Sequence, residues 1–278
     1  MKNTVKILSL SFVVLFLGIL FYSCSKDSSA NSTVPSGSQN VSLYMTDAPG
    51  VFDKVLIDIQ SVQVLVDTCN SSGRPHQEPC NVWETLNVTP GIYDLLTLRN
   101  GTDTLLAGAT IPNGNVTFIK IQLGPLDSLV KDSISYPLRI RDSSVILVDV
   151  SKNRWDEFAP RRFRLWLDFD VSRSVVNVSG NQFYLDPFIR IFTLATTGGV
   201  SGSVWPIFNA FPVISVYNSS DTAYALPSFN GSFMVRGLSP GTYSVFVNAS
   251  NGYADTTITG VTVTAGGTIH LGEIKLHK

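Results

Sequence analysis

The chain has 278 residues and a formal net charge of −1, with 20 Lys and Arg against 21 Asp and Glu. This balance excludes a strongly basic surface, and we expect no nucleic-acid partner. Only 15% of the residues are charged, whereas Gly and Phe are numerous. That usage is typical of sheet-rich extracytoplasmic proteins.

An export signal is predicted at the N-terminus. Lys2 and Lys6 precede an uncharged apolar run over residues 7–22, which ends at Ser23 and Cys24. This order of basic, apolar and small residues indicates a signal peptide over residues 1–23. The run is shorter than the roughly 20 residues that span a bilayer. A transmembrane anchor and an ordinary secretory signal with a chance cysteine remain the alternatives.

The segment from Leu20 to Cys24 resembles the bacterial lipobox. The resemblance implies that Cys24 receives a diacylglyceryl group, so that the mature chain meets the membrane through a lipid anchor. By similarity to lipoprotein sorting signals, Ser25 implies an outer membrane lipoprotein that faces the periplasm or the cell surface. Residues 24–40 are rich in Ser, also contain Asn, Thr, Pro and Gly, and have almost no apolar residue, so we expect them to form a flexible tether.

Two cysteines remain once Cys24 is assigned to the lipid. Cys69 and Cys80 flank a polar segment, and in an oxidising envelope they are predicted to form a disulfide. Closing such a loop contributes roughly 3 kcal/mol in the loop-entropy model. Zinc bound with His76 is the alternative, but two Cys and one His lack a fourth ligand, so no metal is predicted.

From Val41 onward the dominant hydrophobic period is two, which predicts an all-β fold. The run from residue 55 to 66 changes phase near Gln60 and Ser61, which predicts a bulge. Pro187 predicts an edge or a break within residues 183–192. Only residues 126–134 and 155–159 have the pattern of a helical turn. Further strands are expected at residues 41–45, 116–123, 145–150 and 163–171.

The strand at residues 163–171 is predicted to have one buried face, from Phe163 to Val171. Asp168 and Asp170 then share the opposite face, which we interpret as ion-paired, solvated or interdomain. Calcium ligation is one alternative, and a catalytic carboxylate pair, with Asp149 as a further candidate, is another.

Catalytic signatures are scarce in the sequence. The candidate bases at neutral pH are His76, His270 and His277, and no nucleophile-elbow, zinc-protease, P-loop or dinucleotide motif occurs. We therefore expect no enzyme and no cofactor.

A change of pattern near Gly198 and Gly199 predicts two domains, over residues 41–197 and 198–278. Turn residues recur every eight to twelve positions in the second, which is typical of a β-sandwich. Near its start, Trp205, Phe208 and Phe211 are crowded into residues 205–212, together with Pro206 and Pro212. We expect a loop or edge whose aromatic side chains plug the sandwich or pack between the domains, with an exposed ligand platform as the alternative.

The second domain resembles the transthyretin-like (prealbumin-like) regulatory domain of carboxypeptidases. The motifs that carry the resemblance are Gly231-Ser232-Phe233, the run from Gly237 to Tyr243, Gly252-Tyr253 and the run from Val261 to Gly266. The family consists of accessory modules, often grouped with carbohydrate-binding-like folds. The resemblance implies that the second domain is a β-sandwich, and we expect the first domain to be a β-sandwich as well.

Residues 40–193 resemble an uncharacterised domain family (a domain of unknown function) of bacterial envelope lipoproteins. The motifs include the runs Leu43–Pro49, Leu167–Asp170 and Pro187–Arg190. The expected function is that of a lipid-anchored envelope or cell-surface protein with a non-catalytic binding or scaffolding role. A carbohydrate-binding accessory protein and a fimbrial-type structural subunit are the alternatives, and the expected partners are the membrane and a glycan or envelope protein.

Overall fold

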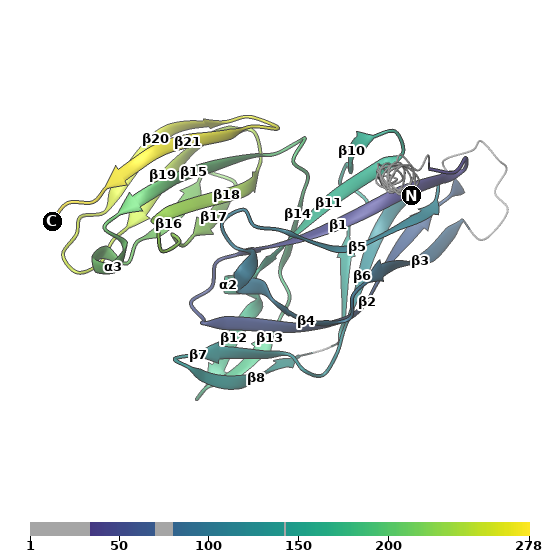
Figure 1. Cartoon of the computed structure of the whole chain (residues 1–278), viewed down its shortest axis with the longest axis horizontal. Helices are drawn as coiled ribbons and strands as arrows, with labels where there is room; N and C mark the ends of the chain where they lie inside the picture. Colours follow the sequence, from purple (N-terminus) through teal and green to yellow (C-terminus); the bar gives the residue numbers. More distant parts are fainter. Residues whose placement is uncertain (1–33, 70–79, 142) are drawn as a thin grey trace, which may run out of the picture. The chain divides into compact units, whose positions relative to one another are not determined.

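A computed structural model describes residues 34–69, 80–141 and 143–278 (Figure 1). The fold is all-β, as predicted. Besides strands, the described part contains α2 (Val171–Ser174), α3 (Ile207–Ala210) and a 3₁₀ turn at Leu95–Leu98. No helix within the described ranges has the length and hydropathy needed to cross a membrane. The predicted signal peptide and Cys24 lie outside these ranges.

Strands β1 to β14 form one hydrogen-bonded network in the order β10-β11-β1-β5-β3-β2-β7-β8-β13-β12. Off this path, β14 pairs with β11, β4 and β6 pair with β2, and β9 pairs with β6. One apolar core lies within the network. The strands are β1 (Ser38–Ala48), β2 (Lys54–Asp67), β3 (Asn81–Val88), β4 (Gly91–Asp94), β5 (Thr104–Pro112), β6 (Asn115–Leu123), β7 (Ser128–Lys131), β8 (Ile134–Ile140), β9 (Val145–Asp149), β10 (Asp156–Ala159), β11 (Arg162–Asp170), β12 (Val175–Ser179), β13 (Gln182–Leu185) and β14 (Ile189–Phe192).

The predicted change of phase in β2 is confirmed. The pairing of β2 with β6 shifts register between Ile59 and Ser61, so Ile59 and Val62 both face the core. A bulge of this kind lets one long strand keep an apolar face on both sides of the shift. Pro187 lies between β13 and β14, so the predicted break is also observed.

The two segments expected to form helical turns are strands instead. Residues 128–131 form β7, which pairs with β2 and β8, and residues 156–159 form β10, which pairs with β11. In β7 the buried Leu129 faces the core between two partners, and a tight turn with positive φ at Asp132 and Ser133 leads into β8. Backbone pairing with distant strands overrides the weak local helical pattern.

Strand β1 begins at Ser38, within the segment 24–40 that was predicted to be a flexible tether. Ser38, Gln39 and Asn40 already pair with β5, and Gln39 is buried, with its amide Nε2 donating to the Gly114 carbonyl at 2.9 Å. The predicted tether over residues 24–40 was therefore wrong at its C-terminal end.

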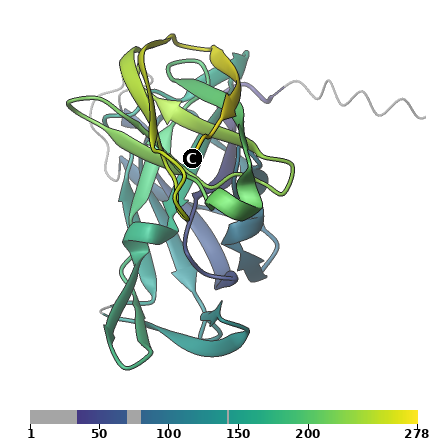
Figure 2. The same cartoon turned by 90° about the vertical axis from the view of Figure 1, so that its left-hand side faces the viewer.

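Residues 198–275 form two further sheets, a three-stranded sheet with the order β18-β15-β21 and a four-stranded sheet with the order β17-β16-β19-β20. They enclose a second apolar core, in which Tyr243, Val245 and Val247 lie on one face of β19. These strands are coloured green to yellow in Figure 1 and in the turned view of Figure 2. They are β15 (Gly198–Trp205), β16 (Val213–Tyr217), β17 (Thr222–Ala225), β18 (Ser232–Leu238), β19 (Gly241–Asn248), β20 (Thr256–Val263) and β21 (Thr268–Lys275).

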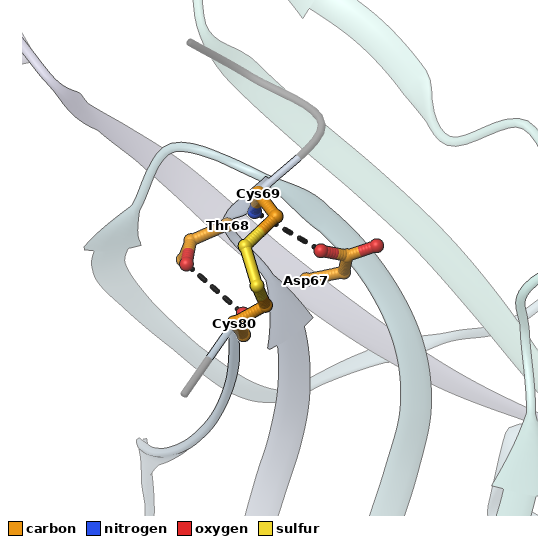
Figure 3. Close-up of a disulfide and its surroundings, with 4 residues drawn as sticks. All are labelled: Asp67, Thr68, Cys69 and Cys80. Carbon is orange, nitrogen blue, oxygen red and sulfur yellow. Dashed lines mark hydrogen bonds between the residues drawn. A yellow bond between two sulfur atoms is a disulfide. The ribbon is translucent and has the colours of Figure 1, made fainter. Parts of the chain in front are cut away.

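A disulfide joins Cys69, just after β2, to Cys80, just before β3, with a Cα–Cα distance of 5.1 Å (Figure 3). The Thr68 hydroxyl donates to the Cys80 carbonyl at 2.9 Å, and the Cys69 N–H donates to the Asp67 carboxylate at 3.0 Å. Because β2 and β3 are consecutive and pair antiparallel, the disulfide joins the two strand ends that the chain connects through residues 70–79. His76 lies outside the described residues.

Candidate functional site

The segment between β15 and β16 presents aromatic rings outward. In α3, Ile207 and Ala210 are buried, whereas Phe208 is 59% exposed. Phe211 ends the helix in the left-handed conformation, with a φ of 43°, and is 62% exposed. Residues 207 and 210 lie three apart, on the inner face of the single turn. The buried side chains of this turn are therefore Ile207 and Ala210, and the expectation that Phe208 and Phe211 plug the sandwich was wrong.

A third phenylalanine joins these two from another part of the chain. Phe229, in the turn between β17 and β18, is 87% exposed, and its ring stacks on that of Phe208 with centroids 6.3 Å apart. Phe229 was not among the site residues predicted from the sequence. Its position directly before the turn residues Asn230 and Gly231 is the signal that could have identified it as exposed.

The three rings line a groove of about 480 Å³, which we call the aromatic groove. Arg99 and Asn100, which follow the 3₁₀ turn, contribute its polar rim. The Asn100 side-chain amide donates to the Leu226 carbonyl at 2.9 Å and to the Ser228 hydroxyl at 3.0 Å, which fixes this rim. The lining residues are Arg99, Asn100, Ile207, Phe208, Phe211, Pro212, Leu226, Pro227, Ser228 and Phe229.

Trp205 does not take part in the aromatic groove. Its side chain is 37% exposed and lies beside Gly231, where an added Cβ would come within 3.2 Å of the indole Nε1. The three residues predicted for one platform are therefore divided: Phe208 and Phe211 share the groove with Phe229, and Trp205 packs against the neighbouring turn.

Both faces of β11 are covered, contrary to the prediction of a single buried face. Asp168 and Asp170 are buried, and so is Asp47 at the end of the neighbouring strand β1. Asp170 caps α2: its carboxylate accepts from the Arg173 N–H at 3.1 Å and pairs with the Arg173 guanidinium at 3.3 Å. The prediction that this face carries ion-paired carboxylates is confirmed for Asp170. The prediction that the face is solvated was wrong, because Asp168 and Asp170 are both buried.

Burial dominates the ionisation of the other two carboxyls. It raises the pKa of Asp168 to about 6, although the charge of Arg190 opposes the shift. It also raises the pKa of Asp47 well above its ordinary value, and the Asp168 charge adds to this. The Asp47 Oδ2 atom has no hydrogen-bond partner within the described ranges.

The hollow beside Asp47 and Asp168 has a volume of only about 30 Å³, roughly the share of one water molecule. No substrate fits there, so the geometry favours a structural role for these carboxyls. Within residues 34–69, 80–141 and 143–278, no group of three or more His, Cys, Asp and Glu side chains is arranged to hold a metal ion. His270 and His277 lie in and after β21, away from this cluster in the sequence.

Comparison with solved structures gives weak similarities. A type II cohesin–X-dockerin complex from Acetivibrio cellulolyticus matches with 26% identity and a TM-score of 0.24, over 28% of this chain and 56% of that chain. The shaft pilin SpaA from Lactobacillus rhamnosus GG matches with 9% identity and a TM-score of 0.22, over 86% of this chain and 97% of that chain. A minor pilin from Streptococcus agalactiae matches with 14% identity and a TM-score of 0.22, over 85% of this chain and 96% of that chain. These scores are too low to transfer any property to this chain.

No curated protein matches the sequence. A family described as a domain of unknown function (DUF4382) matches residues 38–187, which is more than half of the chain. The match covers β1 to β13 and agrees with the expectation of such a domain in the first region. The chain therefore belongs to the DUF4382 family.

Proposed function

We propose that this protein is a lipid-anchored envelope protein that binds a partner non-catalytically through the aromatic groove. The observation that carries the proposal is the grouping of Phe208, Phe211 and Phe229, each more than half exposed, on one groove. Exposing three large apolar rings is unfavourable in water unless a partner covers them.

The chemistry of the groove supports binding rather than catalysis. Its lining contains no His, Cys, Asp or Glu, so it offers no general acid or base. Arg99 is the one charged residue of the lining, and its Nε donates to the Leu96 carbonyl at 2.7 Å. Rings on one side and a fixed polar rim on the other suit a ligand with an apolar face.

The sequence supports the anchored part of the proposal. The apolar run before Cys24 and its resemblance to a lipobox place the lipid at the N-terminus of the mature chain. The outer membrane, with the protein facing the periplasm or the cell surface, is the location we propose. The second region, with its three-stranded and four-stranded sheets around one core, is proposed as a transthyretin-like accessory module.

A triple variant tests the binding role. Phe208→Ala, Phe211→Ala and Phe229→Ala together should reduce retention of the full-length protein on immobilised envelope proteins or envelope glycans at least ten-fold, with little change in melting temperature. Leu126→Ala is the matched control, because Leu126 is 60% exposed and lies outside the groove. Equal retention of the triple variant and the parent on both materials would refute the proposal.

A further inference from the structure

A second groove lies entirely outside the aromatic groove, beside β10 and the start of β1. Its volume of about 620 Å³ is within the range of about 300–1,000 Å³ that small-molecule sites occupy. The segment 151–157 forms one wall, and Gln39, Asn115 and Thr196 contribute from three other parts of the chain. In Figure 1 this region is found at the labels β10, β11 and β1. We call it the polar groove.

The wall of the polar groove is held in place by the fold. The Asp156 carboxylate pairs with the Arg164 Nε at 2.6 Å, across the pairing of β10 with β11. The Trp155 ring packs against the core of the first region. The Gln39 amide is fixed on the Gly114 carbonyl. Side chains anchored in this way are preorganised, so a ligand need not order them.

Several polar groups of this wall have no partner in the part of the chain that the structure describes. Among the described residues, the side chains of Asn115, Asn153 and Arg154 make no hydrogen bond or ion pair. The Trp155 Nε1 is buried and also lacks a partner within this part of the chain. A buried donor left without an acceptor is costly, and a buried water molecule would satisfy it.

The combination of groups indicates the class of ligand. Two amides and a guanidinium supply donors and acceptors for hydroxyl groups, and an indole supplies a flat apolar surface. Sugar rings present hydroxyls around their edges and C–H groups on their faces. Because Asp156 is already paired with Arg164, the wall offers no unpaired buried carboxylate that would favour a metal ion instead.

From this arrangement we infer that the polar groove binds a short oligosaccharide, with Trp155 beneath a sugar ring and Asn153 and Arg154 on its hydroxyls. The site belongs to the first region and uses none of the residues of the aromatic groove. It is therefore independent of the binding role proposed above.

Isothermal titration of the full-length protein in a detergent without a sugar headgroup tests the inference, with cellohexaose and a galacturonic acid hexamer as probes. The parent should bind at least one probe. The double variant Asn153→Ala, Arg154→Ala should bind it at least ten-fold more weakly. The matched control is Asn177→Ala, Arg139→Ala, which changes the same residue types at exposed positions outside the groove and should bind within two-fold of the parent.

Trp155→Phe keeps a ring for core packing but offers the sugar ring a smaller surface, so it should weaken binding about five-fold. The variant with Phe208→Ala, Phe211→Ala and Phe229→Ala, which alters only the aromatic groove, should bind the probe like the parent. This result separates the two proposals. Absence of binding to both probes, or equal binding by the parent and the Asn153 and Arg154 double variant, would overturn the inference.

Discussion

The ring of Phe208, in α3, lies against the ring of Phe229, in the turn after β17, with planes inclined by only 24°. Both rings are largely exposed, whereas Ile207, the residue before Phe208, is buried. Adjacent residues in one turn of helix therefore carry a buried side chain and an exposed one. Stability and binding should respond to different residues of the same segment.

Ile207→Ala should lower the free energy of unfolding by about 2–4 kcal/mol, because Ile207 is buried and the smaller side chain loses its packing contacts. Phe208→Ala should lower it by less than about 1 kcal/mol, since the exposed ring loses only its contact with Phe229. Urea denaturation of the two variants measures both values. A larger loss for Phe208→Ala would mean that its ring belongs to the core.

Removing the disulfide should destabilise the first region. With 11 positions separating Cys69 and Cys80, the double change Cys69→Ala, Cys80→Ala should cost roughly 3 kcal/mol, because the unfolded chain regains the freedom of the loop. Denaturation with and without a reducing agent provides the check. Reduction should destabilise the parent and leave the double variant unaffected; the opposite pattern would contradict the assignment.

The buried carboxyl of Asp168 should make stability depend on pH. Its pKa of about 6 exceeds the ordinary value of 3.8, so the folded state retains a proton that the unfolded chain releases. The free energy of unfolding should therefore fall as pH rises from about 4 to about 6, and Asp168 contributes on the order of 3 kcal/mol to the fall. Asp47, whose pKa is also raised by burial, acts in the same direction.

Asp168→Asn cannot ionise, so the unfolding free energy of this variant should fall less over the same pH range. Asp149→Asn is the control: hydrogen bonds from Ser151 lower the pKa of the exposed Asp149 below its ordinary value of 3.8, so Asp149 contributes little pH dependence above pH 4 and this variant should keep the profile of the parent. Melting curves at pH 4, 5, 6 and 7 compare the three proteins. Identical pH profiles for the parent and Asp168→Asn would refute the role of Asp168.

The turn between β7 and β8 offers a stabilising change. Ser133 has a φ of 63°, a conformation that a serine adopts at a cost and a glycine adopts freely. Ser133→Gly keeps the N–H that donates to the Asp53 carboxylate at 2.9 Å. It should raise the free energy of unfolding by about 0.5–1 kcal/mol, whereas Ser135→Gly, within β8, should lower it by a similar amount. Thermal unfolding measures both variants. A lower melting temperature for Ser133→Gly than for the parent would contradict the positive φ at Ser133.

Cys24 is expected to carry the lipid, since the apolar run delivers it to the membrane surface next to a small residue. Cells that express Cys24→Ala and are fed radiolabelled fatty acid should yield unlabelled protein, while the Cys69→Ala, Cys80→Ala variant should remain labelled. Persistent label on Cys24→Ala would exclude the lipid anchor at this position.

The sequence by itself determined the features that depend on local pattern and on counting. The period of two in residues 55–66 and its change of phase predicted β2 and its bulge, because alternation fixes which side chains face the core. The pairing of Cys69 with Cys80 followed from having only one pair left to form.

Only the tertiary structure decided which surfaces are covered and which distant residues meet. Residues 128–131 and 156–159 became strands because β2 and β11 offered backbone partners, which a local pattern does not contain. Asp168 is buried because other parts of the chain also cover the second face of β11. Phe229 reaches Phe208, and Asn100 reaches Leu226, across chain separations that periodicity cannot bridge. Periodicity identifies the side chains that share a face, and long-range packing determines whether another part of the protein covers that face.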